Sequence, residues 1–155
     1  MTDSAGIVLH RRRDGGDEIL LVHPGGPFWA NKDEHAWSIP KGEYDPAEED
    51  GLAAAEREFA EELGLLLPNG PRRALPEFRA GRKRIAAWRV EGDLDPAAIR
   101  SNTFELEWPP RSGRTEEFPE VDRAAWYDLE TAATKLHKGQ RPLIELIRAA
   151  LENPC

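Results

Sequence analysis

The chain has 155 residues and a formal net charge of -8 at pH 7, from 29 acidic and 21 basic side chains. This length suffices for one compact domain with its own core and is short for two, so we expect a single domain over residues 1–155. The acidic balance argues against nonspecific binding to nucleic acid or to an anionic membrane, but it leaves room for a phosphorylated small molecule, because bound cations would reverse the local field.

Two short apolar segments, residues 4–10 and 18–23, come first along the chain. Both are rich in Val, Ile and Leu, and a polar, Gly-containing stretch separates them. This pattern predicts a hairpin or two neighbouring strands of a central sheet. His10 and His23 lie at the ends of these segments without metal-ligand spacing, so we expect both to be structural or exposed to solvent.

A Gly- and Pro-rich loop at residues 24–34 follows, and it carries Phe28 and Trp29. Connections of this length in compact domains are often functional. An aromatic ring in the loop could stack on a nucleobase, which is worth about 1–3 kcal/mol per base. It could equally pack into the core, as large aromatic side chains often do. Both alternatives stay open.

Residues 36–39 predict a short strand that ends at Pro40. Lys41 and Gly42 come directly afterwards, so we expect a catalytic loop to begin here, at the mouth of the sheet. Because Gly42 has no side chain, its carbonyl oxygen can approach a metal ion closely.

A helix is predicted over residues 52–63, which are rich in Ala, Leu and Glu and are followed by Gly64 as a C-cap. At about 100° per residue, three carboxylates share one edge of this helix, beside its apolar stripe. They belong to Glu58, Glu61 and Glu62, with Arg57 as local counter-charge. Like charges at this spacing repel, and a hard divalent cation would neutralise them. A solvated acidic face is the alternative.

The segment after this helix is interrupted by three prolines, which exclude residues 67–76 from a central strand. Residues 85–90 then predict a strand, and a basic corner precedes it. This corner consists of Arg79, Arg82, Lys83 and Arg84. Arginine there could bind the distal phosphates of a substrate in bidentate fashion, although most charge runs are solvated faces.

The last third of the chain mixes strands, turns and helices. Residues 103–108 alternate between apolar and polar side chains, which predicts a half-buried strand, and residues 111–120 are typical of a polar, mobile loop. The other elements are a turn at residues 93–100, a strand at 124–127, a helix from Asp128 as N-cap to about Leu136, and a helix that begins at Pro142. This order predicts an α/β fold, an α/β/α sandwich around a mixed β-sheet.

The stretch from Gly42 to Leu65 resembles the signature of the Nudix (MutT-like) pyrophosphohydrolases. That signature is a Gly, five residues, a Glu, seven residues and then Arg-Glu-apolar-x-Glu-Glu-x-Gly-apolar. Its second half is filled by Arg57, Glu58, Phe59, Glu61, Glu62, Gly64 and Leu65. The first glutamate departs in register. Seven residues separate Glu49 from Arg57, as the signature requires, but six rather than five separate Gly42 from Glu49, so Glu48 is the alternative. The resemblance implies a Nudix-type sandwich.

The resemblance also implies a Mg²⁺ cofactor, with Mn²⁺ as a substitute. Glu58 and Glu62 would be the principal ligands, Glu61 would share a second ion, and the Gly42 carbonyl would complete the shell. These are the oxygen ligands that magnesium prefers. The positions match the family signature residue by residue.

Arg57 would orient a neighbouring glutamate, and one carboxylate would act as the general base. The candidates for the base are Glu61, Glu49 or Glu48, and the loop acids Glu116, Glu117 and Glu120. We favour Glu120, six residues before Trp126, because it stands where the loop returns to the sheet. The candidate substrate-binding residues are Trp29, Lys41, Arg82 and Arg84.

Two functions are compatible with these residues. The first is a magnesium-dependent pyrophosphohydrolase, in which water attacks phosphorus in a nucleoside diphosphate linked to another moiety, as in a nucleoside triphosphate, a dinucleoside polyphosphate or ADP-ribose. The alternative is a noncatalytic nucleotide-sensing or interaction protein on the same fold. The complete Arg57-Glu58 and Glu61-Glu62 pairs favour the enzyme.

The expected partner is a phosphorylated, nucleotide-like small molecule, with neither nucleic acid nor a membrane, and a homodimer stays open. The single Cys155 cannot form an internal disulfide, and the sequence has neither an apolar run of membrane-span length nor the features of a signal peptide. We therefore expect a soluble, cytoplasmic protein.

Overall fold

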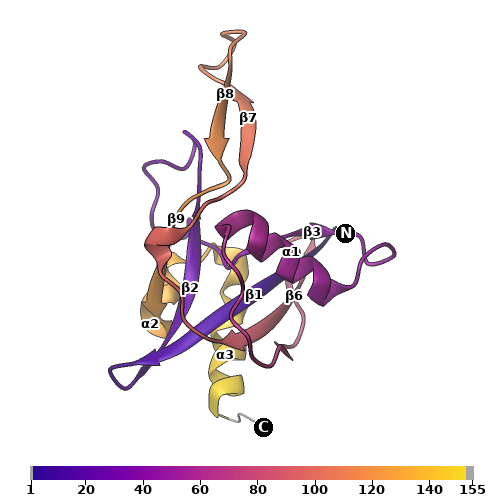
Figure 1. The fold of residues 1–155 in the computed structure, drawn as a ribbon, viewed down its shortest axis with the longest axis vertical. Coiled ribbons are helices and arrows are strands. Elements are labelled where there is room, and N and C mark those ends of the chain that lie inside the picture. Colours follow the sequence, from indigo (N-terminus) through magenta and orange to yellow (C-terminus); the bar gives the residue numbers. More distant parts are fainter. Residues whose placement is uncertain (1, 153–155) are drawn as a thin grey trace.

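The structure is a computed structural model that describes residues 2–152; Cys155 lies outside this range. Seven strands form one mixed sheet, and two further strands form a separate hairpin (Figure 1). The sheet contains β1 (Thr2–Arg13), β2 (Gly16–Pro24), β3 (Lys41–Tyr44), β4 (Arg73–Ala74), β5 (Phe78–Ala80), β6 (Lys83–Glu91) and β9 (Val121–Asp128). The hairpin contains β7 (Thr103–Glu107) and β8 (Thr115–Pro119). The helices are α1 (Gly51–Leu63), α2 (Leu129–Lys135) and α3 (Pro142–Glu152), with short 3-10 turns at Pro96–Ala98 and Lys138–Gln140.

Strand β1 lies at the centre of the sheet, whose main path is β4-β6-β1-β2-β9. It pairs with β2 in the predicted hairpin, where Asp14 and Gly15 both have positive φ (50° and 78°), as a type I′ turn requires. One edge of β1 pairs in parallel with β6. The opposite edge pairs with β2, and near the N-terminal end of β1 it pairs with β3, which is antiparallel. The parallel pair needs a crossover connection, and that connection contains α1.

Helices cover both faces of the sheet, because successive side chains of β1 point to opposite faces. Ile7 and Leu9 pack with Phe59 of α1 in one buried cluster, whereas Val8 packs with Ile147 of α3 in the other. The predicted α/β/α sandwich is therefore confirmed. The predicted helix caps are also present: the Asp128 carboxylate accepts a hydrogen bond at the start of α2, and Gly64 ends α1 with φ 64°.

The predicted strand at residues 36–39 is wrong. Ser38 pairs with Val22 for a single residue, and Trp37 pairs with Leu136 for a single residue on the other side. The backbone of this segment is thus divided between two partners, so neither ladder extends. The regular strand begins at Lys41 instead, which places Lys41 and Gly42 in β3 rather than in a loop.

The predicted mobile loop at residues 111–120 is also wrong in part, because residues 115–119 form β8. This strand pairs with β7 over five residues, and the rings of Phe104 and Phe118 lie 6.1 Å apart across the pair. The alternation predicted for β7 is present, with Phe104 and Leu106 half-buried between exposed neighbours. Figure 1 shows this hairpin projecting from the body of the molecule.

None of the helices within residues 2–152 combines the length and apolar character needed to cross a membrane.

Two glycines with the same φ of 64° offer a test of how tightly α1 is held. A Cβ added at Gly64 would lie 2.1 Å from the carbonyl oxygen of Arg100, whereas one added at Gly81 would meet nothing within 4 Å. We expect Gly81→Ala to lower the free energy of unfolding by about 1–2 kcal/mol, because a residue with a Cβ is strained in a left-handed conformation. Gly64→Ala should cost at least about twice as much, as measured by urea unfolding. Equal losses would contradict the close contact.

Candidate active site

Arg57 on α1 binds three carboxylates at once. Its Nε and Nη2 donate to the two oxygens of Glu49, both at 2.9 Å, and its Nη1 donates to Glu58 at 2.8 Å and to Glu61 at 3.3 Å. The hydrogen bonds to Glu49 raise the pKa of Arg57 and lower the pKa of Glu49. Glu48 is exposed, and its backbone N–H donates to the Asp45 carbonyl in the preceding turn. Glu49 is therefore the residue of the two that contacts the helix arginine.

The Glu58 carboxylate lies directly against Gly42 of β3. A Cβ added at Gly42 would fall 2.0 Å from Cδ of Glu58, so this position has room for a glycine alone. Burial raises the pKa of Glu58, although Arg57 opposes this shift. The strand backbone and the helix carboxylates are thus in contact, as expected for a shared ion site.

Glu62 is the most strongly perturbed of the helix carboxylates. Its Oε1 accepts a hydrogen bond from the backbone N–H of Lys41 at 3.2 Å, and burial raises its pKa to about 8. Burial also lowers the pKa of Lys41, and the neighbouring Lys83 lowers it further. Titratable groups with such shifts beside a cavity are candidates for functional residues.

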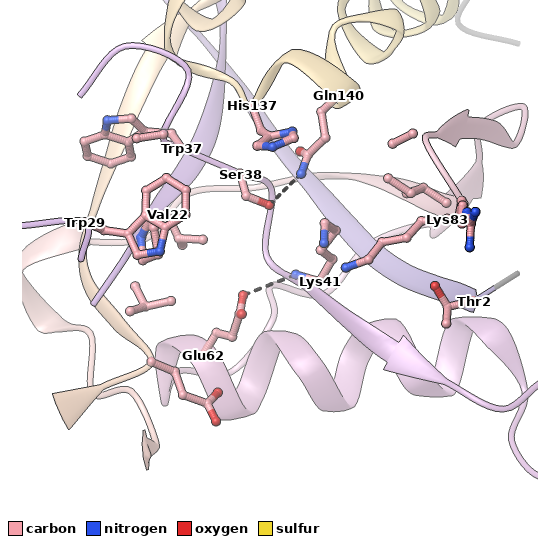
Figure 2. Close-up of a pocket in the computed structure, with 17 residues that line it drawn as sticks. Thr2, Val22, Trp29, Trp37, Ser38, Lys41, Glu62, Lys83, His137 and Gln140 are labelled. Carbon is pink, nitrogen blue, oxygen red and sulfur yellow. Dashed lines mark hydrogen bonds between the residues drawn. The ribbon is translucent and has the colours of Figure 1, made fainter. Parts of the chain in front are cut away.

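A cavity of about 560 Å³ opens beside Glu62 (Figure 2). It collects five predicted residues from distant parts of the chain, namely Trp29, Lys41, Glu62, Arg82 and Glu120. The other acidic candidates on α1, together with Arg57 and Gly42, do not line it. Arg84 does not line it either, because its Nε donates to the Asp3 carboxylate at 2.8 Å.

The three acids of the loop before β9 separate clearly. Glu116 and Glu117 are exposed on β8, and Glu117 accepts a hydrogen bond from the Thr103 hydroxyl. Glu120 follows β8 and lines the cavity together with Glu62. Its backbone is held on both sides, since its N–H donates to Asn102 and its carbonyl accepts from Gly25. Glu120 is thus the loop acid that shares a cavity wall with Glu62 of α1.

Trp29 lies between the core and the cavity. Its half-buried ring packs against the core cluster on the α2 and α3 side, and it also lines the cavity. The ammonium of Lys32 lies 5.0 Å from the centre of this ring. Phe28 is 59% exposed and contacts Trp108 edge-on, with ring centres 5.6 Å apart.

The cavity is also lined by residues that were not predicted as site residues, among them Ser38, Lys83, His137 and Gln140. Gln140 is buried, and its Nε2 donates to Ser38 Oγ at 2.9 Å (Figure 2). Its Oε1 accepts a hydrogen bond from the Ile39 backbone N–H. This contact joins residues 102 positions apart, so no local spacing could indicate it. Lys83 belonged to the predicted basic corner but was not singled out.

The chemistry of these side chains fits a divalent metal, because the donors on α1 are all carboxylates. The close contact of Glu58 with Gly42 also places the backbone of β3 beside this carboxylate. In the present side-chain positions, no three His, Cys, Asp or Glu residues within 2–152 converge on one point. Instead, Arg57 donates hydrogen bonds to Glu58 and Glu61, and the backbone N–H of Lys41 donates to Glu62. A bound cation would therefore compete with these hydrogen bonds.

Comparison with known proteins identifies the family of the chain. The NUDIX domain family profile matches residues 1–147, and no curated protein matches the chain at a significant level. The chain is similar to the Ap4A hydrolase of C. elegans in a binary complex (22% identity, TM-score 0.63, 98% of each chain). It is also similar to the NUDIX domain of Shewanella oneidensis NrtR complexed with ADP ribose (18% identity, TM-score 0.63, 96% of this chain and 87% of that one).

A third similar structure is the E. coli ORF135 protein in solution (23% identity, TM-score 0.58, 100% of this chain and 96% of that one). At these identities the likeness of the structures concerns the fold. The family profile goes further, because it spans nearly the whole chain, including the arginine and carboxylates of α1. The chain belongs to the Nudix family and is a hydrolase acting on phosphoanhydride bonds.

Proposed function

We propose that the chain is a Mg²⁺-dependent pyrophosphohydrolase, with Mn²⁺ as a substitute, for a nucleoside diphosphate linked to another moiety. The observation that carries this proposal is the position of Glu62, which is half-buried in the wall of a cavity that Lys41, Arg82 and Glu120 also line. A carboxylate in this setting is neutral without a cation and charged with one. We take residues 1–155 as one domain that acts in the cytoplasm.

Glu58 and Glu62 would hold the ion, with Glu61 and the Gly42 carbonyl completing its ligands. A bound divalent cation neutralises negative charge on the phosphoryl oxygens and lowers the pKa of the water bound to it. If Glu58 and Glu61 held the ion, Arg57 would still have its two hydrogen bonds to Glu49. Arg57 would thus continue to fix the helix against the preceding loop during turnover.

The remaining residues would bind the substrate and move protons. Lys41 and Arg82 would offset the negative charge of the phosphates, and the ring of Trp29 would stack on a base. Glu120 would accept the proton of the attacking water. Arg84 is a weaker candidate for a phosphate contact, since it is already paired with Asp3.

The alternative is a noncatalytic protein that senses a nucleotide. Solved relatives include a NUDIX domain complexed with ADP ribose and an Ap4A hydrolase, which supports a nucleotide-like ligand in either case. The two functions differ in turnover. The alternative predicts binding of a nucleotide without release of nucleoside monophosphate in magnesium.

Glu62→Gln tests the proposed function directly. With a panel of a nucleoside triphosphate, a dinucleoside polyphosphate and ADP-ribose, we expect the parent to release nucleoside monophosphate and the variant to lose kcat by several orders of magnitude. Magnesium at about 100 times its Kd should stabilise the parent by about 2–3 kcal/mol and the variant far less. Glu56→Gln is the matched control, because Glu56 is on the same helix but pairs with Arg72. A fully active Glu62→Gln variant would contradict the assignment of Glu62 as a metal ligand.

Stability in EDTA should depend on pH through Glu62. Its pKa is about 8 in the folded chain, against an ordinary value of 4.5. The neutral form is favoured by folding, so this stabilising contribution is complete below about pH 4.5 and is lost as pH rises through about 8. The loss should be on the order of a few kcal/mol. Thermal unfolding in EDTA between pH 5 and 9 should show this loss of stability in the parent and not in Glu62→Gln. Parallel curves of Tm against pH for the two proteins would contradict the prediction.

Glu120→Gln separates the candidates for the general base. Removal of the base should lower kcat by about 10²- to 10⁴-fold with little change in the magnesium-induced shift of Tm. Glu117→Gln is the control, since Glu117 is a neighbouring acid on the hairpin outside the cavity. Near-normal kcat in Glu120→Gln together with a large loss in Glu61→Gln would move the base to the helix.

A further inference from the structure

A second cleft, of about 400 Å³, adjoins the main cavity between the loop after β2 and the hairpin β7–β8. The two cavities share a border, which consists of Pro24, Trp29, Glu62 and Glu120. Beyond this border the second cleft is lined by Gly25, Gly26, Phe28, Phe104 and Leu106. Glu62 and Glu120 therefore stand between two spaces that a ligand could occupy.

The walls of the second cleft are fixed by close packing. The Gly25 N–H donates to the Glu120 carbonyl at 2.9 Å, and a Cβ added at Gly25 would lie 1.9 Å from the Pro119 carbonyl oxygen. A Cβ added at Gly26 would lie 3.0 Å from the ring of Phe104. Loop and hairpin are thus in direct contact, so the cleft exists before any ligand arrives.

The two spaces differ in charge. The main cavity contains Lys41, Arg82 and Lys83, which suit phosphate groups. The second cleft has apolar and aromatic walls, two carboxylates at its border, and no Lys, Arg or His among its lining residues within 2–152. Even with a cation on Glu62, this cleft offers no positive side chain of its own. A free terminal phosphate would be desolvated there without compensation.

We propose that the second cleft binds an aromatic or apolar group that caps the far end of the substrate's phosphate chain. The substrate is then a diphosphate or polyphosphate with an organic group at both ends, rather than a nucleoside triphosphate with a free terminal phosphate. This rests on the proposed function and narrows its substrate class. Phe104 and Phe28 contact the capping group, and their rings provide faces on which a planar ring can stack.

The test compares diadenosine tetraphosphate with adenosine 5′-tetraphosphate, which carry the same phosphates and differ by one adenosine. The parent should prefer the doubly capped compound at least fivefold in kcat/KM. Phe104→Ala should remove this preference while it leaves kcat/KM for adenosine 5′-tetraphosphate within twofold. Phe118→Ala is the matched control, because Phe118 packs beside Phe104 in the hairpin but does not line the cleft. Phe28→Ala is the second variant, since a side chain that is 59% exposed can be truncated without unfolding the chain.

Binding measured by calorimetry in EDTA separates the two proposals, because it needs no turnover. The parent should bind the doubly capped compound at least fivefold more tightly than adenosine 5′-tetraphosphate, and Phe104→Ala and Phe28→Ala should reduce that difference. Equal affinities in the parent, or equal losses for both compounds in the variants, would overturn the second site while hydrolysis by the parent stands. Tight, Phe104-dependent binding of the capped compound without hydrolysis in magnesium would instead uphold the second site and reject the proposed function.

Discussion

One guanidinium holds helix α1 and the loop before it in a single arrangement. Arg57 spans Glu49 in that loop and Glu58 and Glu61 on its own helix. Without it, these carboxylates would repel one another across about one helical turn. The two parallel hydrogen bonds to Glu49 also fix the direction in which the guanidinium faces. The positions of Glu49, Glu58 and Glu61 depend on this shared contact.

The contact between Gly42 and Glu58 sets a second constraint. The Glu58 carboxylate can lie against β3 at this position only because Gly42 has no side chain. Because β3 pairs with β1 in the middle of the sheet, the site is tied to the most buried strand of the molecule. The loop and hairpin around the cavities are tied to it less directly, through Gly25 and Glu120. The acidic groups of α1 are thus held against the centre of the sheet, whereas the cavity walls are held by contacts between the loop and the hairpin.

Sequence reasoning succeeded where the determining contacts are local. The span of α1, its C-cap at Gly64 and the shared edge of its carboxylates all follow from spacing within about three turns. It failed at residues 36–39, where single-residue pairings with two distant partners replace a ladder. The cavity residue Gln140 and the pairing of Arg84 with Asp3 were equally hidden, because their contacts cross about half the chain or more. Such juxtapositions are fixed by the topology rather than by any neighbouring residue.

The parallel pairing of β1 with β6 has a consequence for how the chain folds. Asp3 and Arg84 face each other across these strands although they lie 81 residues apart in sequence. The first strand to be synthesised must therefore wait for β6 before the centre of the sheet can close, and loop closure over such a distance slows folding. Until then the edge of β1 and the apolar face of α1 are exposed together. The nascent chain is thus most prone to association with other chains during the synthesis of its middle third.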